Sequence, residues 1–187
     1  RAPSLEPAHV SAYARVVEQG TRLHTQVRRG EVPAPDDDDE ADKYELAEQV
    51  LAAAGYEWYE ISNWARPGHE CRHNILYWTG GEYLAVGCAA HGHRHGRRHW
   101  NHRTPERYVS AIEHGRSPES GSEELDADGR RVEGLQLAIR TREGIPASEV
   151  RPDFLHDLDG LVEQRHDRVV LTPRGRLLAN EVAIRLE

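Results

Sequence analysis

The residues best suited to chemistry gather in one short segment, residues 67–78 (PGHECRHNILYW). The side chains concerned are His69, Cys71, His73, Tyr77 and Trp78. Imidazole and thiolate groups bind metals, and flat aromatic side chains can wall a planar ligand. The segment could therefore serve a zinc ion, a cysteine nucleophile or a haem, or it could be purely structural.

The spacing of the ligands weakens two of these possibilities. Structural zinc sites use paired short spacings, and neither CxxC nor HExxH occurs in the chain. A nucleophile needs an imidazole and an orienting group; Cys71 and His73 would share a face of an extended segment, but nothing indicates a substrate. Haem needs one axial ligand and an aromatic pocket, and without CxxCH it would be held non-covalently. Haem and a structural role both stay open.

A second group of histidines lies in the tract 91–102 (HGHRHGRRHWNH). We interpret this tract as an arginine-rich solvated loop. Adventitious metal binding, or attraction of haem propionates, is the alternative.

The elements that must position these residues begin with a predicted βαβ unit. His9–Val17 is rich in β-branched and small apolar residues and predicts a buried strand, and a short helix follows from Thr21 to about Arg29. Asp36 is a helix cap, and the acidic residues behind it suit a first turn. That helix ends at Gly55, and Tyr56–Ile61 is the second strand, which implies a parallel sheet.

The middle segment is expected to form loops and short hairpins. Glu82–Cys88 predicts a strand, with Arg97–Trp100 as its partner. Thr104-Pro105 begins a helix that reaches about His114, because proline is favoured at the first helical position. Ser117–Ser122 is then interpreted as a polar linker.

The last segment predicts helices around a hairpin, an arrangement that resembles a winged helix. Val132, Leu135, Ala138 and Ile139 mark a helix ending near Gly144. Further expected elements are a short helix in Pro146–Leu158, a hairpin in Leu161–Leu171 and a closing helix capped by Thr172-Pro173, with Leu178, Val182 and Leu186 inward. Residues 141–187 hold seven arginines against nine acidic residues, a net charge of −2, so DNA binding is not expected.

Composition limits the classes further. The 187 residues carry 24 basic and 32 acidic groups, a net charge of −8, which argues against nucleic acid as a partner. No stretch approaches the ~20 apolar residues of a membrane span, although peripheral contact with a membrane is not excluded. Two cysteines, Cys71 and Cys88, cannot build a disulfide framework, so we expect a cytoplasmic protein. Because methionine is absent, we expect the C-terminal part of a longer chain.

Several motifs together resemble the HemW-type haem chaperones, relatives of oxygen-independent coproporphyrinogen III oxidase in the radical SAM superfamily. The residues that carry the resemblance are Tyr59–Gly68 (YEISNWARPG), Cys71–Asn74, Tyr77-Trp78, His9–Ala14, Asp42–Tyr44, Gly81–Leu84 and Leu171–Gly175. The HNxxYW signature, His73 to Trp78, is the motif associated with haem binding in that family, and the true oxidases lack it.

The resemblance implies a haem site formed by His73, Asn74, Tyr77 and Trp78, with His73 as the iron ligand. Asn74 or a backbone carbonyl would orient the imidazole. It further suggests Ala14 and His91 as contacts of S-adenosylmethionine (SAM). The family's CxxxCxxC motif, which holds a 4Fe–4S cluster, is absent, so this chain should bind no cluster and perform no radical chemistry alone.

The fold class we expect is α/β. Residues 1–66 would be the last strands and helices of a radical SAM barrel, residues 67–103 the HNxxYW and histidine-rich loop and hairpin region, and residues 104–187 a mostly helical, winged-helix-like domain. The expected function is binding of haem and its delivery to acceptor proteins. The alternatives are a coproporphyrinogen III oxidase and a plain interaction module. In the family's Gly-x-Gly-Ala-His-Ser loop this chain has Ala89, which a positive φ would strain.

Overall fold

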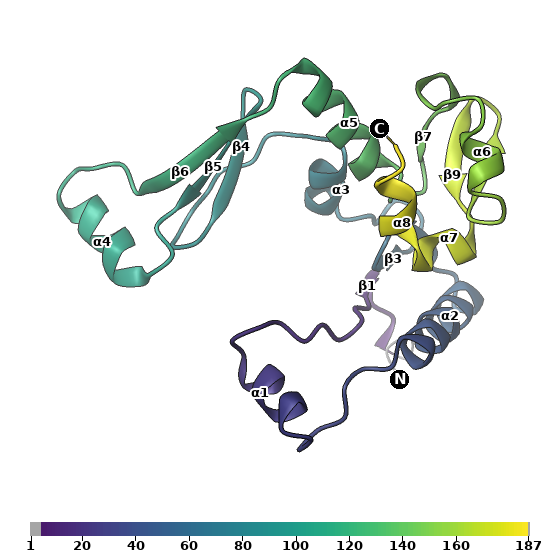
Figure 1. Cartoon of the computed structure of the whole chain (residues 1–187), viewed down its shortest axis with the longest axis horizontal. Coiled ribbons are helices and arrows are strands. Elements are labelled where there is room, and N and C mark those ends of the chain that lie inside the picture. The colour runs from purple at the N-terminus through teal and green to yellow at the C-terminus, as the bar shows by residue number, and fades with distance from the viewer. Residues whose placement is uncertain (1–4, 187) are drawn as a thin grey trace.

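The computed structural model describes residues 5–186 and combines helices with three small sheets (Figure 1). In chain order the elements are β1 (His9–Ser11), α1 (Arg22–Arg28), α2 (Asp37–Ala53), β2 (Glu57–Glu60), β3 (Asn63–Ala65), α3 (Arg72–Trp78), β4 (His91–Arg94), β5 (Arg97–Asn101), α4 (Pro105–Glu113), β6 (Glu119–Glu124), α5 (Ala127–Ala138), β7 (Ile145–Pro146), the 3₁₀ turn η2 (Ala147–Glu149), α6 (Phe154–Asp157), β8 (Val162–Arg165), β9 (Arg168–Leu171), α7 (Pro173–Leu177) and α8 (Ala179–Ala183).

The first sheet differs from the expected parallel pair. Its order is β1-β3-β2, and β3 pairs antiparallel with both neighbours, so β1 and β2 do not touch as strands. The cause is the short turn at Ile61-Ser62, which returns the chain between the two predicted strands. The strand predicted at His9–Val17 is also shorter, since only residues 9–11 pair.

Helix α2 covers this sheet as its sequence predicts. The Asp36 carboxylate accepts a hydrogen bond from the Asp39 backbone N–H at 3.0 Å, and four acidic residues occupy the first turn. Gly55 adopts a φ of +81° directly after the helix. Buried Leu51 packs with Tyr56, Trp58 and Trp64 into one apolar core.

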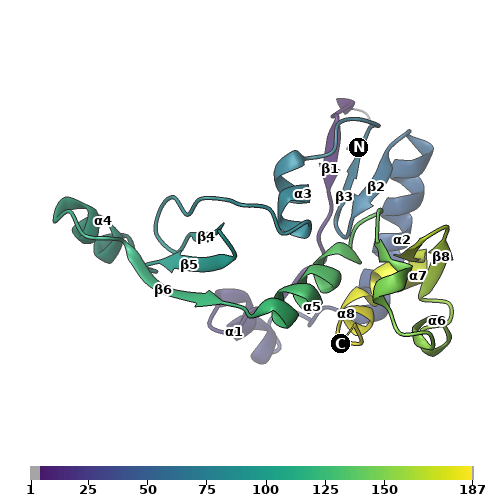
Figure 2. The same ribbon diagram turned by 90° about the horizontal axis from the view of Figure 1, so that it is seen from above.

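The second sheet forms an arm, β4–β6 with α4 at its tip (residues 91–124), that projects from the rest of the molecule (Figure 1, Figure 2). Thr104 caps α4 as expected. Two predictions were wrong here. The predicted strand Glu82–Cys88 forms only an isolated bridge, between Tyr83 and His93. Its predicted partner, now β5, pairs with β4 and β6 and not with that segment.

The predicted polar linker Ser117–Ser122 is largely strand β6. Polar side chains did not mark it as a strand, but ion pairs across the sheet stabilise it: Arg97 reaches Glu119, and Arg98 reaches Glu123 at 2.9 Å. Gly121 leaves room for Trp100, because a Cβ at this glycine would lie 2.6 Å from the indole.

The third sheet, β7-β9-β8, packs with α5, α6 and α8 around a second apolar core. The predicted hairpin is present, with His166 at a φ of +56° in its turn, and Thr172 caps α7 by accepting from the Gly175 N–H at 3.0 Å.

Three details of this last segment differ from the predictions. Helix α5 ends at Ala138, before the predicted end near Gly144, and Gly144 has a φ of +60° in the turn that leads into β7. Pro146–Leu158 holds two separate short elements, η2 and α6, since Pro152 interrupts them. The closing helix breaks at Leu178, which is 41% exposed, whereas Val182 and Leu186 are buried as predicted.

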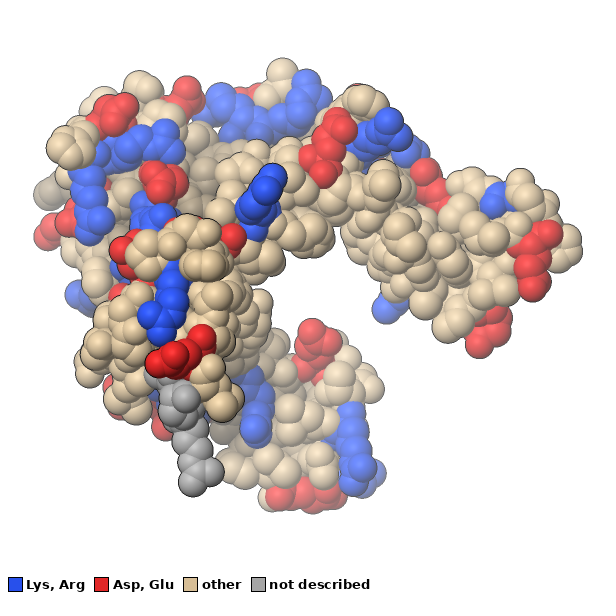
Figure 3. Space-filling model, turned by 180° about the vertical axis from the view of Figure 1, so that it is seen from behind, with Lys and Arg blue, Asp and Glu red and all other residues tan. Residues whose placement is uncertain are grey.

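Charges of both signs are interspersed over the face shown in Figure 3. None of the described helices is both long and apolar enough to cross a membrane.

Candidate functional site

The HNxxYW segment forms helix α3 rather than a loop or extended strand. Residues four apart lie on the same face of a helix, so the motif makes two stacked pairs, His73 with Tyr77 and Asn74 with Trp78, on adjacent faces. Cys71 is only the N-cap residue and caps without a side-chain hydrogen bond. The expectation that Cys71 and His73 share an extended face was therefore wrong.

The His73 and Tyr77 pair faces solvent. The two rings meet edge to face with centroids 4.8 Å apart, and the Tyr77 hydroxyl lies 3.4 Å from His73 Nε2. A contact of this length is a weak hydrogen bond. The imidazole is thus accessible and only loosely engaged, which suits a side chain that binds a ligand.

Asn74 does not orient His73. Its Nδ2 donates to the Tyr59 hydroxyl at 3.3 Å, and that hydroxyl lies 2.8 Å from His9 Nε2. Burial raises the pKa of Tyr59 to about 12, so its hydroxyl keeps its proton, and burial lowers the pKa of His9. A neutral His9 can accept from Tyr59, which anchors α3 to β1 and β2.

A cavity of about 450 Å³ opens on the Asn74 and Trp78 side of α3. Its size falls in the range of pockets that hold small molecules and cofactors. The walls come from α3, from the β2–β3 turn and from the segment after β1: Tyr13, Glu60, Ile61, Ser62, Asn63, Asn74, Tyr77 and Trp78. Three of the four predicted haem residues therefore line one cavity, and His73 stands beside it on the same helix.

Glu60 places a carboxylate in the wall of this cavity although the residue is only 1% exposed. The Asn63 side-chain amide donates to it, and the Ser11 hydroxyl donates to the Asn63 carbonyl oxygen. Burial raises the pKa of Glu60, while hydrogen bonds from the Ser62 backbone and the Trp78 side chain lower it.

A row of rings joins α3 to the arm. Tyr77 meets Tyr83 at 4.5 Å between ring centroids, and Tyr83 meets His93 of β4 at 6.0 Å. Paired backbone hydrogen bonds of 2.9 Å fix Tyr83 to His93. The Nδ1 atom of His93 lies 3.0 Å from the Gly81 carbonyl oxygen, so part of the histidine-rich tract is ordered hairpin rather than free loop.

The predicted SAM contacts are not brought together. Ala14 is exposed and lines a separate cavity of about 590 Å³ with residues of α2 and α7. His91 is exposed on β4, where its ring lies 5.9 Å from Trp100, and lines neither cavity. Ala89 adopts a φ of +57°, so the loop takes the left-handed conformation although the residue is not glycine. Among the described residues, no group of three or more His, Cys, Asp or Glu side chains could hold a metal ion.

Sequence reasoning missed Glu60, Tyr59 and Tyr83 as parts of this site. Each lies within a quoted motif, YEISN or GEYL. Of the two acidic residues in the predicted strand Tyr56–Ile61, only Glu60 shares an alternating face with Tyr56 and Trp58, and this was the signal that could have singled it out.

Comparison with known proteins identifies homologues of this chain. No family model matches it. The chain is 48% identical, over 93% of its length, to the heme chaperone HemW of Mycobacterium tuberculosis (strain ATCC 25618 / H37Rv) and 30% identical, over 96%, to HemW of Bacillus subtilis (strain 168). These alignments cover 46% and 51% of the relatives, so the chain spans about half the length of the curated relatives it matches.

A solved structure supports the same relationship at the level of fold. Coproporphyrinogen III oxidase HemN from Escherichia coli, a radical SAM enzyme, superposes with a TM-score of 0.75 at 16% identity, covering 99% of this chain and 49% of that one. The HNxxYW helix and the two HemW alignments lead to one conclusion: the chain is homologous to the HemW heme chaperones over about half of their length.

Proposed function

We propose that this chain binds haem beside helix α3 and takes part in its delivery to haem-acceptor proteins. The observation that carries the proposal is the placement of HNxxYW: an accessible imidazole at His73 stands beside an aromatic-walled cavity of about 450 Å³. An axial ligand such as imidazole and a flat apolar wall suit non-covalent haem binding.

Each motif residue then has a role that follows from its contacts. His73 supplies the iron ligand, because its weak contact with the Tyr77 hydroxyl can yield to a stronger bond to iron. Tyr77 and Trp78 line the cavity and contribute apolar area against the porphyrin. Asn74 holds the helix to Tyr59 and so fixes the distance between ligand and wall.

The cofactors of the longer relatives enter only by family likeness. Those proteins are radical SAM relatives, and a 4Fe–4S cluster would need the CxxxCxxC motif, which this chain does not contain. SAM, if bound by a longer form, would approach the segment after β1 at Ala14 and the loop before β4 at His91. We also propose a cytoplasmic location.

The domain division is part of the same proposal. Residues 1–66 form the end of a radical SAM barrel, residues 67–103 the HNxxYW and histidine-rich region, and residues 104–187 the C-terminal domain, whose helices around the β7-β9-β8 sheet would form a winged-helix-like end. The likeness to HemN supports this division, since it covers 99% of the chain.

A second candidate function is oxidation of coproporphyrinogen III, which the likeness to the HemN structure favours. The HNxxYW motif argues against it, because the resemblance that motif carries is to the chaperone branch. An assay of coproporphyrinogen III conversion separates the two.

The test is a titration with ferric haem, followed by the shift of the Soret band, with the M. tuberculosis relative as positive control. We expect one equivalent to bind, and His73→Ala to weaken binding at least about tenfold and to change the spectrum, because an axial ligand is lost. His93→Ala and His95→Ala should have smaller effects, and Trp78→Ala should lower affinity without changing the ligand spectrum.

Cys71→Ala is the necessary control, because a thiolate two residues from His73 would give a different Soret position. If His73→Ala left both affinity and spectrum intact, the assignment of the ligand would be wrong. If the unsubstituted chain bound no haem, the proposed function itself would fail for this chain.

A further inference from the structure

The cavity beside α3 contains one unusual group. Of the described residues that line it, only Glu60 carries a charged side chain; the others are aromatic, apolar or neutral polar. A carboxylate that is 1% exposed is costly to bury, and such groups persist where partners or function compensate them.

The partners of Glu60 are all donors. The Asn63 amide donates a hydrogen bond to its carboxylate, and the N–H donors of the Ser62 backbone, the Trp78 indole and the Ile61 backbone lower its pKa. Asn63 is itself fixed by the Ser11 hydroxyl. Donors of this kind favour the ionised form and so oppose the effect of burial. At a pH above its raised pKa, the cavity wall therefore presents a fixed, hydrogen-bonded negative charge on an otherwise neutral surface.

We infer that Glu60 determines which oxidation state of haem the cavity prefers, by placing one buried negative charge against the cationic ferric form. In ferric haem the porphyrin dianion and the iron sum to one positive charge, and in ferrous haem they sum to zero. The propionates are the same in both forms. A negative wall thus stabilises ferric haem relative to ferrous haem, and the inference rests on the haem site proposed above.

The size of the effect follows from Coulomb's law at the scale of a cofactor site. A unit charge that acts across about 10 Å at an effective dielectric constant of about 20 changes the ratio of two affinities roughly tenfold. Glu60→Gln should therefore lower the ratio of ferric to ferrous affinity by roughly tenfold. The reduction potential of bound haem should become more positive by the corresponding amount.

The experiment measures ferric and ferrous haem affinities, and the potential of bound haem, in the 187-residue chain and three variants. Glu60→Gln removes the charge, but the amide N–H of the introduced glutamine can face the amide N–H of Asn63, so that two donors oppose each other. The double variant Glu60→Gln with Asn63→Asp returns the charge to the neighbouring residue, and the introduced glutamine can donate to the introduced carboxylate. Glu57→Gln is the matched control, because Glu57 is on the same strand but exposed and outside the cavity.

We expect the double variant to recover most of the ferric preference and Glu57→Gln to retain all of it. If both affinities fell equally in Glu60→Gln, so that their ratio and the potential stayed unchanged, Glu60 would be merely structural and the inference would be overturned. A double variant that folds but fails to restore the ratio would overturn it too. Absence of haem binding by the unsubstituted chain would instead refute the proposed site.

Discussion

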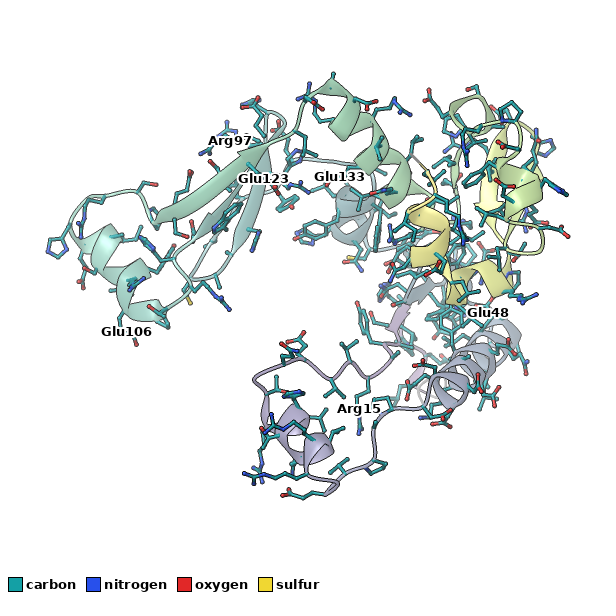
Figure 4. The ribbon with its side chains drawn as sticks, viewed as in Figure 1. Arg15, Glu48, Arg97, Glu106, Glu123 and Glu133 are labelled. Atoms are coloured by element: carbon teal, nitrogen blue, oxygen red, sulfur yellow. The ribbon has the colours of Figure 1, made fainter. Side chains whose placement is uncertain are left out.

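Arg176 joins helix α7 to the first apolar core, and its removal is the most direct test of how the fold is held together. Its guanidinium carbon lies 3.9 Å from the centroid of the Trp58 ring, and its Nη1 lies 3.0 Å from Glu48 Oε1. The other oxygen of Glu48 accepts from the Trp64 indole N–H. Figure 4 shows Glu48 where α2 approaches α7. One arginine therefore connects the last helices to α2, β2 and β3.

The cost of Arg176→Ala can be estimated from this burial. The Arg176 side chain is 13% exposed and Glu48 is 28% exposed. A desolvated cation–π contact contributes about 1–2 kcal/mol. Breaking a fully buried ion pair costs about 3–5 kcal/mol, so a partly exposed pair should cost about 1–2 kcal/mol. We expect Arg176→Ala to lower the free energy of unfolding by about 2–4 kcal/mol, and Arg176→Lys by roughly half as much, because lysine lacks the planar fork.

Urea unfolding followed by two signals is the assay. All four tryptophans lie at or before Trp100, so fluorescence reports the first part of the chain, whereas far-UV circular dichroism reports all of it. In Arg176→Ala we expect a lower midpoint and a fluorescence transition that precedes the dichroism transition. Arg174→Ala, an exposed neighbour on the same helix, should change stability by less than about 0.5 kcal/mol. An Arg176→Ala midpoint equal to that of Arg174→Ala would refute the reasoning.

Two further predictions concern packing and pH. Gly175→Ala should destabilise the chain by about 3 kcal/mol or more, because the new Cβ would lie 1.8 Å from the Leu161 carbonyl oxygen; Gly134→Ala, with open space around it, should not destabilise, and thermal unfolding compares them. Burial raises the pKa of Glu60 above its usual 4.5, so this group's contribution to stability is fully present below that value and is lost as pH rises through the folded value. The stability of the unsubstituted chain relative to Glu60→Gln should therefore grow as pH falls from 7 toward 4.5, and parallel urea midpoints across this range would contradict the assignment.

The sequence predicted correctly those helices and that hairpin whose ends are set by a capping or turn residue. Asp36, Thr104 and Thr172 each accept a hydrogen bond from a backbone N–H in the first turn of a helix, as their residue types predict. The turn of the last hairpin was found because His166-Asp167 separates two apolar runs. These features depend on residues only a few positions apart, so they can be predicted from the local sequence alone.

The pairing of strands depended on contacts that no local pattern records. Strand β6 is polar throughout, and it is a strand because β5 supplies hydrogen bonds and ion pairs. Strand β3 lies between β1 and β2 because a tight turn at Ile61-Ser62 returns the chain, and the apolar runs on either side were equally compatible with a parallel pair. Where tertiary contacts choose among partners, periodicity cannot predict the choice.

The site was predicted in its residues but not in its geometry. Helix α3 has only seven residues and lacks a side-chain cap, so its sequence carries little helical signal. Its position is fixed instead by the hydrogen bond from the Asn74 side chain to the Tyr59 hydroxyl, a group that is distant in sequence. The motif predicted which residues take part in the site, whereas the packing of α3 against β2 determines which of them are exposed and which line the cavity.

The helix also explains the spacing of HNxxYW in physical terms. Each turn places His73 and Tyr77 on one face and Asn74 and Trp78 on the next, so the proposed iron ligand and the cavity wall lie on adjacent faces of one helix. The first face contains the weakly held imidazole, and the second lines the cavity together with Glu60. Loss of His73 should therefore act on the ligand spectrum and loss of the Glu60 charge on the oxidation-state preference. Because the two residues are not in contact in this arrangement, the effects should be separable, and a combined variant should show both in full.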